Sequence, residues 1–198
     1  MADRHSYQTI TDWQRLDAAT GEAIRAFWLR EKANVAGDEA TRRLAEVVAH
    51  VVDENGELAA VATVATKILP RLGQPMYYYR CFVGKAWRTR RVVRPLLRHT
   101  QKVLEAYARE NGYPCIGMLL ELENEGFSDT LRRAHWTGIG FSYIGISPRG
   151  LDLRVWYFRG ARLKTPAELA ELRERTAGVR QLRRRATISA EAGPPAHA

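Results

Sequence analysis

Residues 76–99 read MYYYRCFVGKAWRTRRVVRPLLRH, an apolar strand-like segment that runs into a basic loop and then into a helical pattern. Between Gly84 and Leu104 there is no acidic residue, but there are seven basic ones, so this window carries +7 of the chain's formal net charge of +9. Such a junction predicts a binding site for phosphate. The alternative interpretation is a basic surface that only water covers.

The start of the helix after this loop supplies a physical reason for phosphate. The first four backbone N–H groups of a helix lack partners within it and lie at the positive end of its dipole, so an anion there meets both donors and a favourable field. Proline is tolerated in a first turn but costs about 3 kcal/mol deeper in a helix. Pro95 therefore predicts a helix that starts between Val92 and Pro95, with Arg88–Arg91 as a basic loop over its end.

The spacing of apolar residues changes along the chain in an order that indicates one mixed α+β domain. The turn signal Glu54-Asn55-Gly56 marks a hairpin, and the nearly continuous apolar run Cys115–Leu122 is typical of a strand buried on both faces. Because one long helix links that run to Met76–Val83, these two strands are expected to be adjacent and parallel and to splay apart at their C-terminal ends. The expected strands are Tyr7–Ile10, Val48–Val52, Leu58–Leu69, Met76–Val83, Cys115–Leu122, Phe141–Ser147 and Leu151–Phe158, and the expected helices are Ala19–Glu31, Asp38–Val47, Val92–Asn111 and Phe127–His135.

Composition narrows the classes of partner and compartment. A chain of 198 residues with 45% hydrophobic residues is long enough for one domain with a core, and its pI near 9.9 favours an anionic partner such as nucleic acid, a lipid surface, a nucleotide-like cofactor or an acidic protein. The N-terminus lacks the apolar segment of a secretory signal, and no run of about 18 apolar residues occurs, so a soluble, cytoplasmic protein is expected. Cys81 and Cys115 lack metal-ligand spacing and are expected to be buried thiols, with no metal site.

The order of elements resembles the fold of the GCN5-related N-acetyltransferase (GNAT) superfamily over roughly residues 5–160. The resemblance implies a mostly antiparallel sheet of about seven strands flanked by helices. In that superfamily the fourth strand leads into a motif R/Q-x-x-G-x-G/A, whose backbone amides hold the pyrophosphate of acetyl-CoA. The aligned residues here are Arg88-Thr89-Arg90-Arg91-Val92-Val93, so Arg91 and Val93 stand where the motif has small residues. The residues that would hold the donor are Val83, Arg88, Thr89, Arg90, Arg91, Val92, Val93, Arg94 and Asn124.

The resemblance also implies an activity, the transfer of an acyl group from a thioester to an amine. In the superfamily a carboxylate or a bound water near the fourth and fifth strands usually takes the proton from the amine. Glu121 and Glu123 lie on one face at the end of a buried strand, where a desolvated carboxylate could act as that base. Alternatively, one or both could pair with Arg80 or Arg88 across the sheet.

The acid that protonates the departing thiolate differs from the superfamily pattern. A tyrosine on the helix after the fifth strand often has this role, but the segment Phe127–His135 contains no tyrosine. The resemblance therefore leaves Ser128, His135 and Tyr143 as the candidates.

Beyond the GNAT-like part, the sequence predicts a short extension. Thr165, Pro166 and Glu168 form a capping box with proline at the first helical position, so an extra C-terminal helix is expected from Pro166 to about Arg175. The last residues are small, polar and proline-containing, which is typical of disorder. The expected organisation is a GNAT-like acyltransferase domain over residues 1–161, a basic helical extension over 162–185 and a disordered tail over 186–198.

Three classes of function remain open from the sequence. The leading one is an N-acyltransferase that uses acyl-CoA or an acyl-carrier protein, long acyl chains included. Val93 would crowd a pyrophosphate, whereas a carrier protein has a single phosphodiester and an acidic surface that suits the arginines. The second class is an acyltransferase for a nucleic-acid or ribosomal substrate, and the third is a non-catalytic GNAT-like binding module. The sequence does not identify the acceptor, an amine of a small molecule or peptide; no membrane span is expected, and a homodimer is compatible with it.

Overall fold

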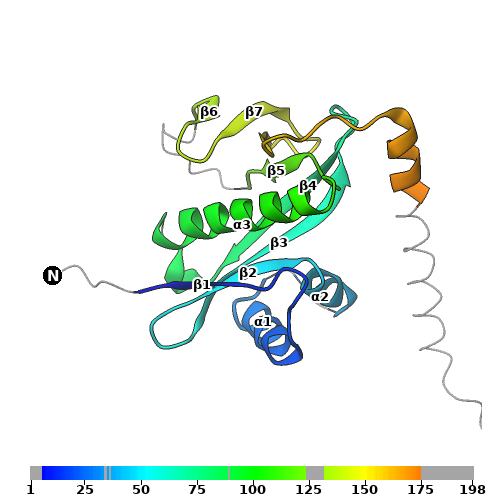
Figure 1. Cartoon of the computed structure of the whole chain (residues 1–198). Helices are drawn as coiled ribbons and strands as arrows, with labels where there is room; N and C mark the ends of the chain where they lie inside the picture. Colours follow the sequence, from blue (N-terminus) through cyan, green and yellow to red (C-terminus); the bar gives the residue numbers. More distant parts are fainter. Residues whose placement is uncertain (1–5, 34, 36, 89, 124–131, 175–198) are drawn as a thin grey trace, which may run out of the picture. The chain divides into compact units, whose positions relative to one another are not determined.

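The computed structural model describes residues 6–174 except residues 34, 36, 89 and 124–131. Contacts divide the chain into two compact units, Met1–Ala161 and Arg162–Ala198. The first unit holds the sheet and its flanking helices (Figure 1). In the second unit residues 166–174 are helical, and Thr165 and Glu168 exchange the reciprocal hydrogen bonds of a capping box.

The first unit is built on one eight-stranded sheet with the order β1-β2-β3-β4-β5-β8-β7-β6. Neighbouring strands are antiparallel except β4 and β5, which are parallel (Figure 1). The predicted α+β architecture with a mostly antiparallel sheet is therefore confirmed, with one strand more than expected. The strands are β1 (Gln8–Thr11), β2 (Val47–Val52), β3 (Leu58–Ile68), β4 (Pro75–Val83), β5 (Gly117–Glu121), β6 (His135–Trp136), β7 (Phe141–Ile146) and β8 (Asp152–Tyr157).

Helices cover both faces of this sheet. α3 buries Leu96 and Leu104 in a core with Tyr77 on one face, which we call the α3 face. On the opposite face, called the α1 face, α1 packs Phe27 against Phe82 with ring centroids 5.6 Å apart. None of the helices in the described ranges is long and apolar enough to cross a bilayer. The helices of the first unit are α1 (Ala18–Arg30), α2 (Gly37–Leu44), the short 3-10 helix η1 (Lys85–Trp87) and α3 (Arg90–Glu110).

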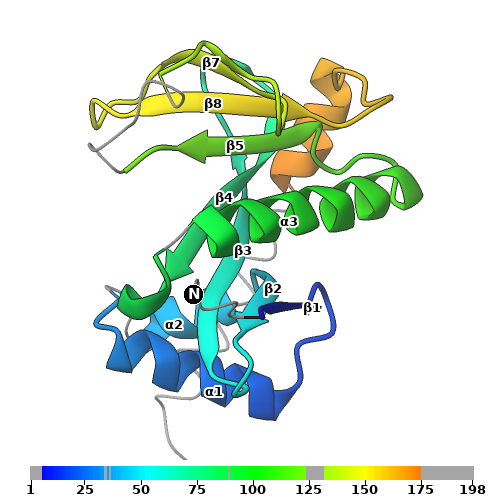
Figure 2. The same cartoon turned by 90° about the vertical axis from the view of Figure 1, so that its left-hand side faces the viewer.

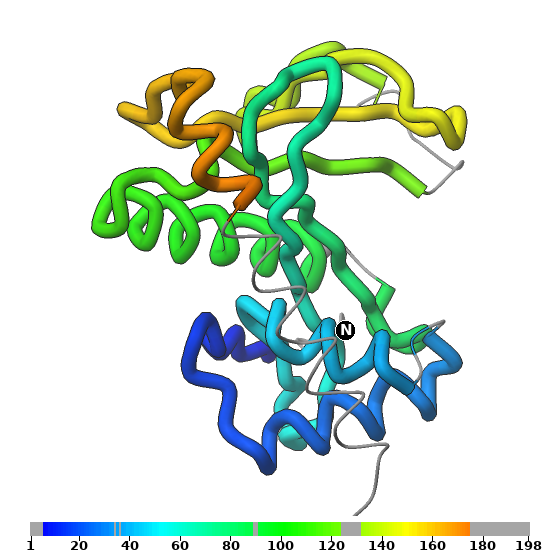
Figure 3. Tube along the Cα trace, turned by 90° about the vertical axis from the view of Figure 1, so that its right-hand side faces the viewer, coloured from blue at the N-terminus to red at the C-terminus, as the bar shows by residue number. Residues whose placement is uncertain are grey.

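The strands β3 and β4 form a long hairpin, traced in cyan and green in Figure 3. Because side chains alternate along a strand, consecutive residues of β4 face different cores. Tyr77 and Tyr79 belong to the core on the α3 face, whereas Tyr78 belongs to a separate cluster on the α1 face. Thus the tyrosines of the YYYR run are divided between the two faces, and only Tyr78 shares a face with the end of β5 that carries Glu121.

The parallel strands β4 and β5 separate at their C-terminal ends. Their pairing covers three positions, the last of which joins Tyr79 to Leu120. Beyond it Val83 still pairs with Ala60 of β3, and Figure 2 shows β4 and β5 pointing away from each other, with the start of α3 beside the end of β4. The predicted pair of parallel, splayed strands is confirmed. On the β5 side, residues 80–83 have no strand partner among the described residues.

Two helix boundaries differ from the predictions. α3 begins at Arg90 and not between Val92 and Pro95, so Pro95 lies inside the helix. Its missing N–H would have bonded the carbonyl of Arg91, and the loss of this one bond near the helix start does not end the helix. α2 ends at Leu44 and does not reach Val47, because this β-branched residue starts β2 and pairs with β3.

The third difference concerns the helix expected over Phe127–His135. Most of that segment lies outside the described residues, but residues 132–134 are turns and bends, and His135 is in β6, where it pairs with Ser142 of β7. The prediction of helix at His135 was wrong. A two-residue strand has too few residues to show a period of two, so no sequence pattern announces it.

Gly117 is expected to be the least replaceable glycine of the sheet. A Cβ atom there would lie 2.2 Å from the backbone oxygen of Trp156 in β8, and backbone cannot move aside as a flexible side chain can. Gly117→Ala should therefore lower the free energy of unfolding by about 3 kcal/mol or more, measured by urea denaturation. Gly21→Ala is the matched control, because its Cβ would meet only side chains at 3.8 Å or more inside α1, and it should be neutral or stabilise by up to about 1 kcal/mol. Equal midpoints for both variants would contradict this account.

Candidate active site

The loop between β4 and α3 is closely packed where it leaves the strand. Gly84 is buried, and a Cβ atom there would lie 2.8 Å from the ring of Trp87 and 3.1 Å from Phe27. The Lys85 N–H donates to the carboxylate of Glu31, the residue that caps the end of α1, at 2.9 Å. The path of the chain from strand to helix is therefore fixed on its α1 side.

Arg88 and Arg91 lie exposed at the start of α3. Arg88 Nε donates a long hydrogen bond of 3.4 Å to the carbonyl of Val83, the last residue of β4. Neither guanidinium has an ion pair with a described residue. Two cations without carboxylate partners in the described part of the chain, next to the start of a helix, form an arrangement that suits phosphate.

Two other arginines of the basic window hold a turn of the protein itself. Arg98 donates to the carbonyl of Gly138 at 2.7 Å, and Gln101 donates to the carbonyl of Ile139 at 2.8 Å. Arg94 lies so close to the same turn that a Cβ atom on Gly138 would be 2.3 Å from its Nη2. The basic window is therefore not uniformly available to a ligand, and Arg94 is less available than Arg88.

The two valines in the first turns of α3 have different environments. Val92 is buried in the core on the α3 face, so only its backbone could meet a donor. Val93 remains 39% exposed. At the position of a small residue in the GNAT motif, Val93 thus adds two methyl groups to the surface of the helix start.

Glu121 lies at the end of β5 and is held by three polar groups, those of Tyr78, Arg149 and Ser147. The Tyr78 hydroxyl donates to its Oε2 at 2.6 Å, and Arg149 of the β7–β8 turn lies 3.4 Å from the same oxygen. Arg149 also pairs with Glu123 at 2.9 Å. The side chain of Glu121 is only 9% exposed, whereas that of Glu123 is 65% exposed, so Glu121 is the carboxylate with a defined orientation.

The environment keeps Glu121 ionised and Tyr78 protonated. Burial alone would raise the pKa of Glu121, but hydrogen bonds from Ser147 and Tyr78 and the charge of Arg149 outweigh it, so this pKa lies below its ordinary value. The pKa of Tyr78 is raised, first by burial and then by its hydrogen bond to Glu121. At neutral pH the pair is therefore a carboxylate held by a phenol donor. The sequence predicted a desolvated carboxylate, but in the structure the partners of Glu121 reverse the effect of burial on its pKa.

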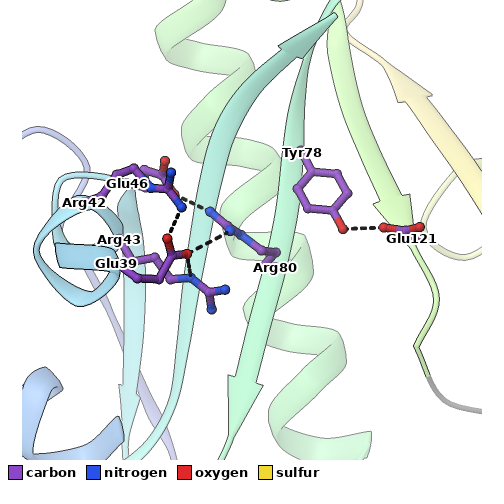
Figure 4. A network of polar contacts seen from close by, with 7 residues as sticks. All are labelled: Glu39, Arg42, Arg43, Glu46, Tyr78, Arg80 and Glu121. Carbon is purple, nitrogen blue, oxygen red and sulfur yellow. Dashed lines mark hydrogen bonds and ion pairs between the residues drawn. The ribbon is translucent and has the colours of Figure 1, made fainter. Parts of the chain in front are cut away.

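A second polar cluster adjoins this pair on β4. Arg80 forms ion pairs with Glu46 and, at 3.8 Å, with Glu39, and α2 contributes Arg42 and Arg43 beside Glu39 (Figure 4). Burial raises the pKa of Glu46, although the charges of Arg80, Arg42 and Arg43 oppose the shift. The face between α2 and β5 thus contains two carboxylates with opposite pKa shifts.

The carboxylates at the end of β5 do not have the partners that sequence analysis offered as an alternative. Glu121 and Glu123 pair with Arg149, not with Arg80 or Arg88. Arg80 is committed to Glu46 on the opposite side of β4 from β5, and Arg88 lies beyond the end of the strand.

The candidates for the acid are not brought to Glu121 in the described part of the chain. His135 is exposed on β6 and bonds Ser142 of β7 at 2.9 Å, while Tyr143 of β7 lies 5.8 Å from the guanidinium of Arg154. Both strands are separated from β5 by β8. The remaining candidate for the acid, Ser128, lies outside the described residues. The same holds for Asn124, Thr89 and the side chain of Arg90, which were predicted to hold the donor.

Three residues of the site were not predicted from the sequence: Glu46, Arg149 and Tyr78, the residue that orients Glu121. The sequence contained one indication that Tyr78 lies on a polar face: Arg80 follows it by two residues, so the two side chains share one face of the strand. Glu46 comes from the end of a helix and Arg149 from a hairpin turn. No local sequence pattern shows how close either residue lies to β5.

Known proteins were compared with this chain by sequence and by structure. No protein-family model and no curated protein sequence matches it. Solved structures do match. A GNAT-family acetyltransferase from Streptococcus pneumoniae superposes with a TM-score of 0.54 at 12% identity, over 77% of this chain and 99% of that one. The chain has the GNAT fold. An N-acetyltransferase from Staphylococcus aureus Mu50 (TM-score 0.51, 16% identity, 78% and 99% covered) and a ribosomal-protein-S5-alanine acetyltransferase from Vibrio fischeri (0.52, 11%, 79% and 95%) show the same architecture.

In this GNAT fold the carboxyl ends of β4 and β5 lie at one edge of the sheet, because the two strands are parallel. The exit of β4 leads to Arg88 and Arg91, and the exit of β5 carries Glu121. Two exposed arginines and an oriented carboxylate therefore stand on two sides of the point where the strands separate.

Proposed function

We propose that this chain transfers an acyl group from a phosphopantetheine thioester to an amine. One observation carries the proposal: β4 and β5 separate beyond Tyr79, between exposed arginines at the start of α3 and the oriented carboxylate of Glu121. The GNAT fold of the chain supports it as an analogy of architecture.

The donor would lie along β4 and the start of α3. Its phosphates would bind Arg88, Arg91 and the first amides of α3, since guanidinium groups can hold phosphate oxygens in pairs. The amides of its pantetheine arm would bond the edge of residues 80–83, which β5 leaves unpaired, as an added strand does. The charges and the backbone geometry fit such a donor, and the exposed methyl groups of Val93 oppose it.

The reaction would use Glu121 as the base. The amine nitrogen attacks the carbonyl carbon of the thioester, its proton passes to the Glu121 carboxylate, the new C–N bond forms and the C–S bond breaks. The sulfur leaves as a thiolate and takes up a proton. Because His135 and Tyr143 lie beyond β8, solvent water would supply that proton. The Tyr78 hydroxyl would keep the carboxylate in place throughout.

The test is binding and turnover with defined donors. Purified protein is expected to bind CoA or an acyl-carrier protein in calorimetry and to release free thiol from the acylated donor when a panel of amines is added. If neither donor binds, the proposal is wrong. If a donor binds but no amine causes thiol release, the chain is a binding module without catalysis.

Acyl-carrier protein is expected to be a better donor than acetyl-CoA, and a long-chain acyl-CoA, which has the same pyrophosphate as acetyl-CoA, is the third donor of the comparison. Val93 crowds a pyrophosphate, whereas the single phosphodiester of a carrier protein is smaller and its acidic surface attracts the basic loop. Turnover with a carrier should fall steeply between about 50 and 300 mM salt, as the Debye length shrinks from roughly 14 to 6 Å. The measurement is kcat/KM for the three donors at two salt concentrations.

Val93→Ala is the matched variant for this comparison, because alanine keeps the helix and removes two methyl groups. It should raise kcat/KM for acetyl-CoA several-fold and leave the carrier donor nearly unchanged. Preference of the unmodified protein for acetyl-CoA at both salt concentrations would show that Val93 is no obstacle.

A further inference from the structure

Lys67 stands beside the proposed site on the α1 face. Its Nζ lies 3.5 Å from the centroid of the Tyr78 ring, and the hydroxyl of the same ring donates to Glu121. The strand register places these residues together, because Lys67 pairs with Met76, which shares its face with Tyr78. An ammonium and a carboxylate thus lie against one phenol, the first over its ring and the second at its hydroxyl.

Lys67 differs from the other cations of this face in its partners. Arg80 and Arg149 each form ion pairs with two carboxylates. Lys67 has no carboxylate within ion-pair distance among the described residues. Its side chain is exposed, and at exposed sites a contact between a cation and an aromatic ring gains only about 0.5–1 kcal/mol. Partial burial and the charge of Arg80 lower the pKa of Lys67, although the charges of Glu121 and Glu46 oppose the shift. An anion placed next to Lys67 would further stabilise its charged form.

From this placement we infer that Lys67 binds a carboxylate of the acceptor, so the acceptor is an amino acid or a similar small molecule with a carboxylate a few bonds from its reacting amine. The inference rests on the proposed function. The amine of such a molecule would face Glu121, and its carboxylate would face Lys67 across the width of one tyrosine side chain. Each charge of the zwitterion then meets its opposite. The donor phosphates do not compete, because their proposed site is at the start of α3.

The test compares L-amino acids with their carboxamides, which share the amine and the side chain but lack the negative charge. With a fixed acylated donor, the unmodified protein should prefer the acids by at least tenfold in kcat/KM. Lys67→Met should raise KM for the acids about 10- to 100-fold, the range for one charge-assisted hydrogen bond, with kcat and the KM of the carboxamides changed by less than about threefold. Lys67→Arg should restore most of the affinity. Arg109→Met, at the exposed far end of α3, is the control for the loss of one surface charge.

Two results would overturn the inference: equal use of acids and carboxamides by the unmodified protein, or an equal rise of both KM values in Lys67→Met. Donor binding, measured without acceptor, separates this failure from that of the proposed function. A protein that binds no donor has neither property. The protein could also bind the donor but acylate only amines that lack a carboxylate, or acylate no amine of the panel. Either result would contradict the role of Lys67 and leave the proposed donor site intact.

Discussion

Replacement of Glu121 by glutamine is expected to lower kcat by about 100- to 10,000-fold, the usual contribution of a general base, while donor affinity changes by less than about twofold. Glutamine keeps the shape of the side chain and can still accept the Tyr78 hydrogen bond, so the variant should fold normally. It cannot take the proton of the amine. The measurement is the rate of thiol release at saturating donor and amine, together with calorimetric donor binding.

Parallel variants decide which carboxylate is the base. Glu123→Gln should reduce kcat by less than about tenfold, because that side chain is mostly exposed and has no fixed orientation beyond Arg149. Glu46→Gln tests the carboxylate whose pKa burial raises. Glu110→Gln, on the exposed end of α3, controls for the loss of one negative charge. A large loss in Glu46→Gln with full activity in Glu121→Gln would transfer the role of the base to Glu46.

Replacement of both Arg88 and Arg91 by alanine is expected to weaken donor binding about 100-fold. Each guanidinium is exposed, so we take the low end of the range for a charge-assisted hydrogen bond, about 1.5 kcal/mol or roughly tenfold for each single variant. The two residues lie three apart and could contact the same phosphate, so the double variant also measures their coupling. Calorimetry with CoA or with the carrier protein gives the values.

The control for this prediction is a donor without phosphate. S-acetylpantetheine should bind the double variant as well as it binds the unmodified protein, because it offers no anion to the arginines. Arg109→Ala on the same helix should leave CoA affinity within about twofold. If the double variant binds CoA normally, the two arginines are a basic surface that water covers, and the donor phosphates lie elsewhere.

The sequence was sufficient for the central part of the fold. β4, α3 and β5 follow one another, each has a clear apolar period, and a helix that crosses over between neighbouring strands of one sheet makes those strands parallel. The position of Glu121 could also be predicted, since this residue ends a buried strand. Two helix boundaries were predicted wrongly, because local signals conflict there. Pro95 is tolerated in the early turns of α3, and the β-branched Val47 belongs to a strand although it follows a helical segment.

The polar partners within the site could not be predicted, because they depend on contacts between segments that are distant in sequence. Arg80 meets Glu46 because the antiparallel register sets Thr63 opposite Arg80 and Glu46 next to that part of β3. Arg149 reaches Glu121 because the β7–β8 turn lies near the end of β5. No periodicity within a strand encodes either distance.

The hydrogen bond from the Lys85 amide to Glu31 connects the two substrates of the proposed reaction. It joins the loop that would hold donor phosphate to α1, which packs against Phe82 on the face that also carries Tyr78 farther back along β4. If a donor shifts this loop, α1 is expected to shift with it. Thermodynamic linkage makes such an effect reciprocal: if the donor raises the affinity for the acceptor by some factor, the acceptor raises the affinity for the donor by the same factor. Initial-rate measurements would show this synergy as a KM for each substrate that falls as the concentration of the other rises, and breaking one surface hydrogen bond with Glu31→Ala would make the two binding events independent.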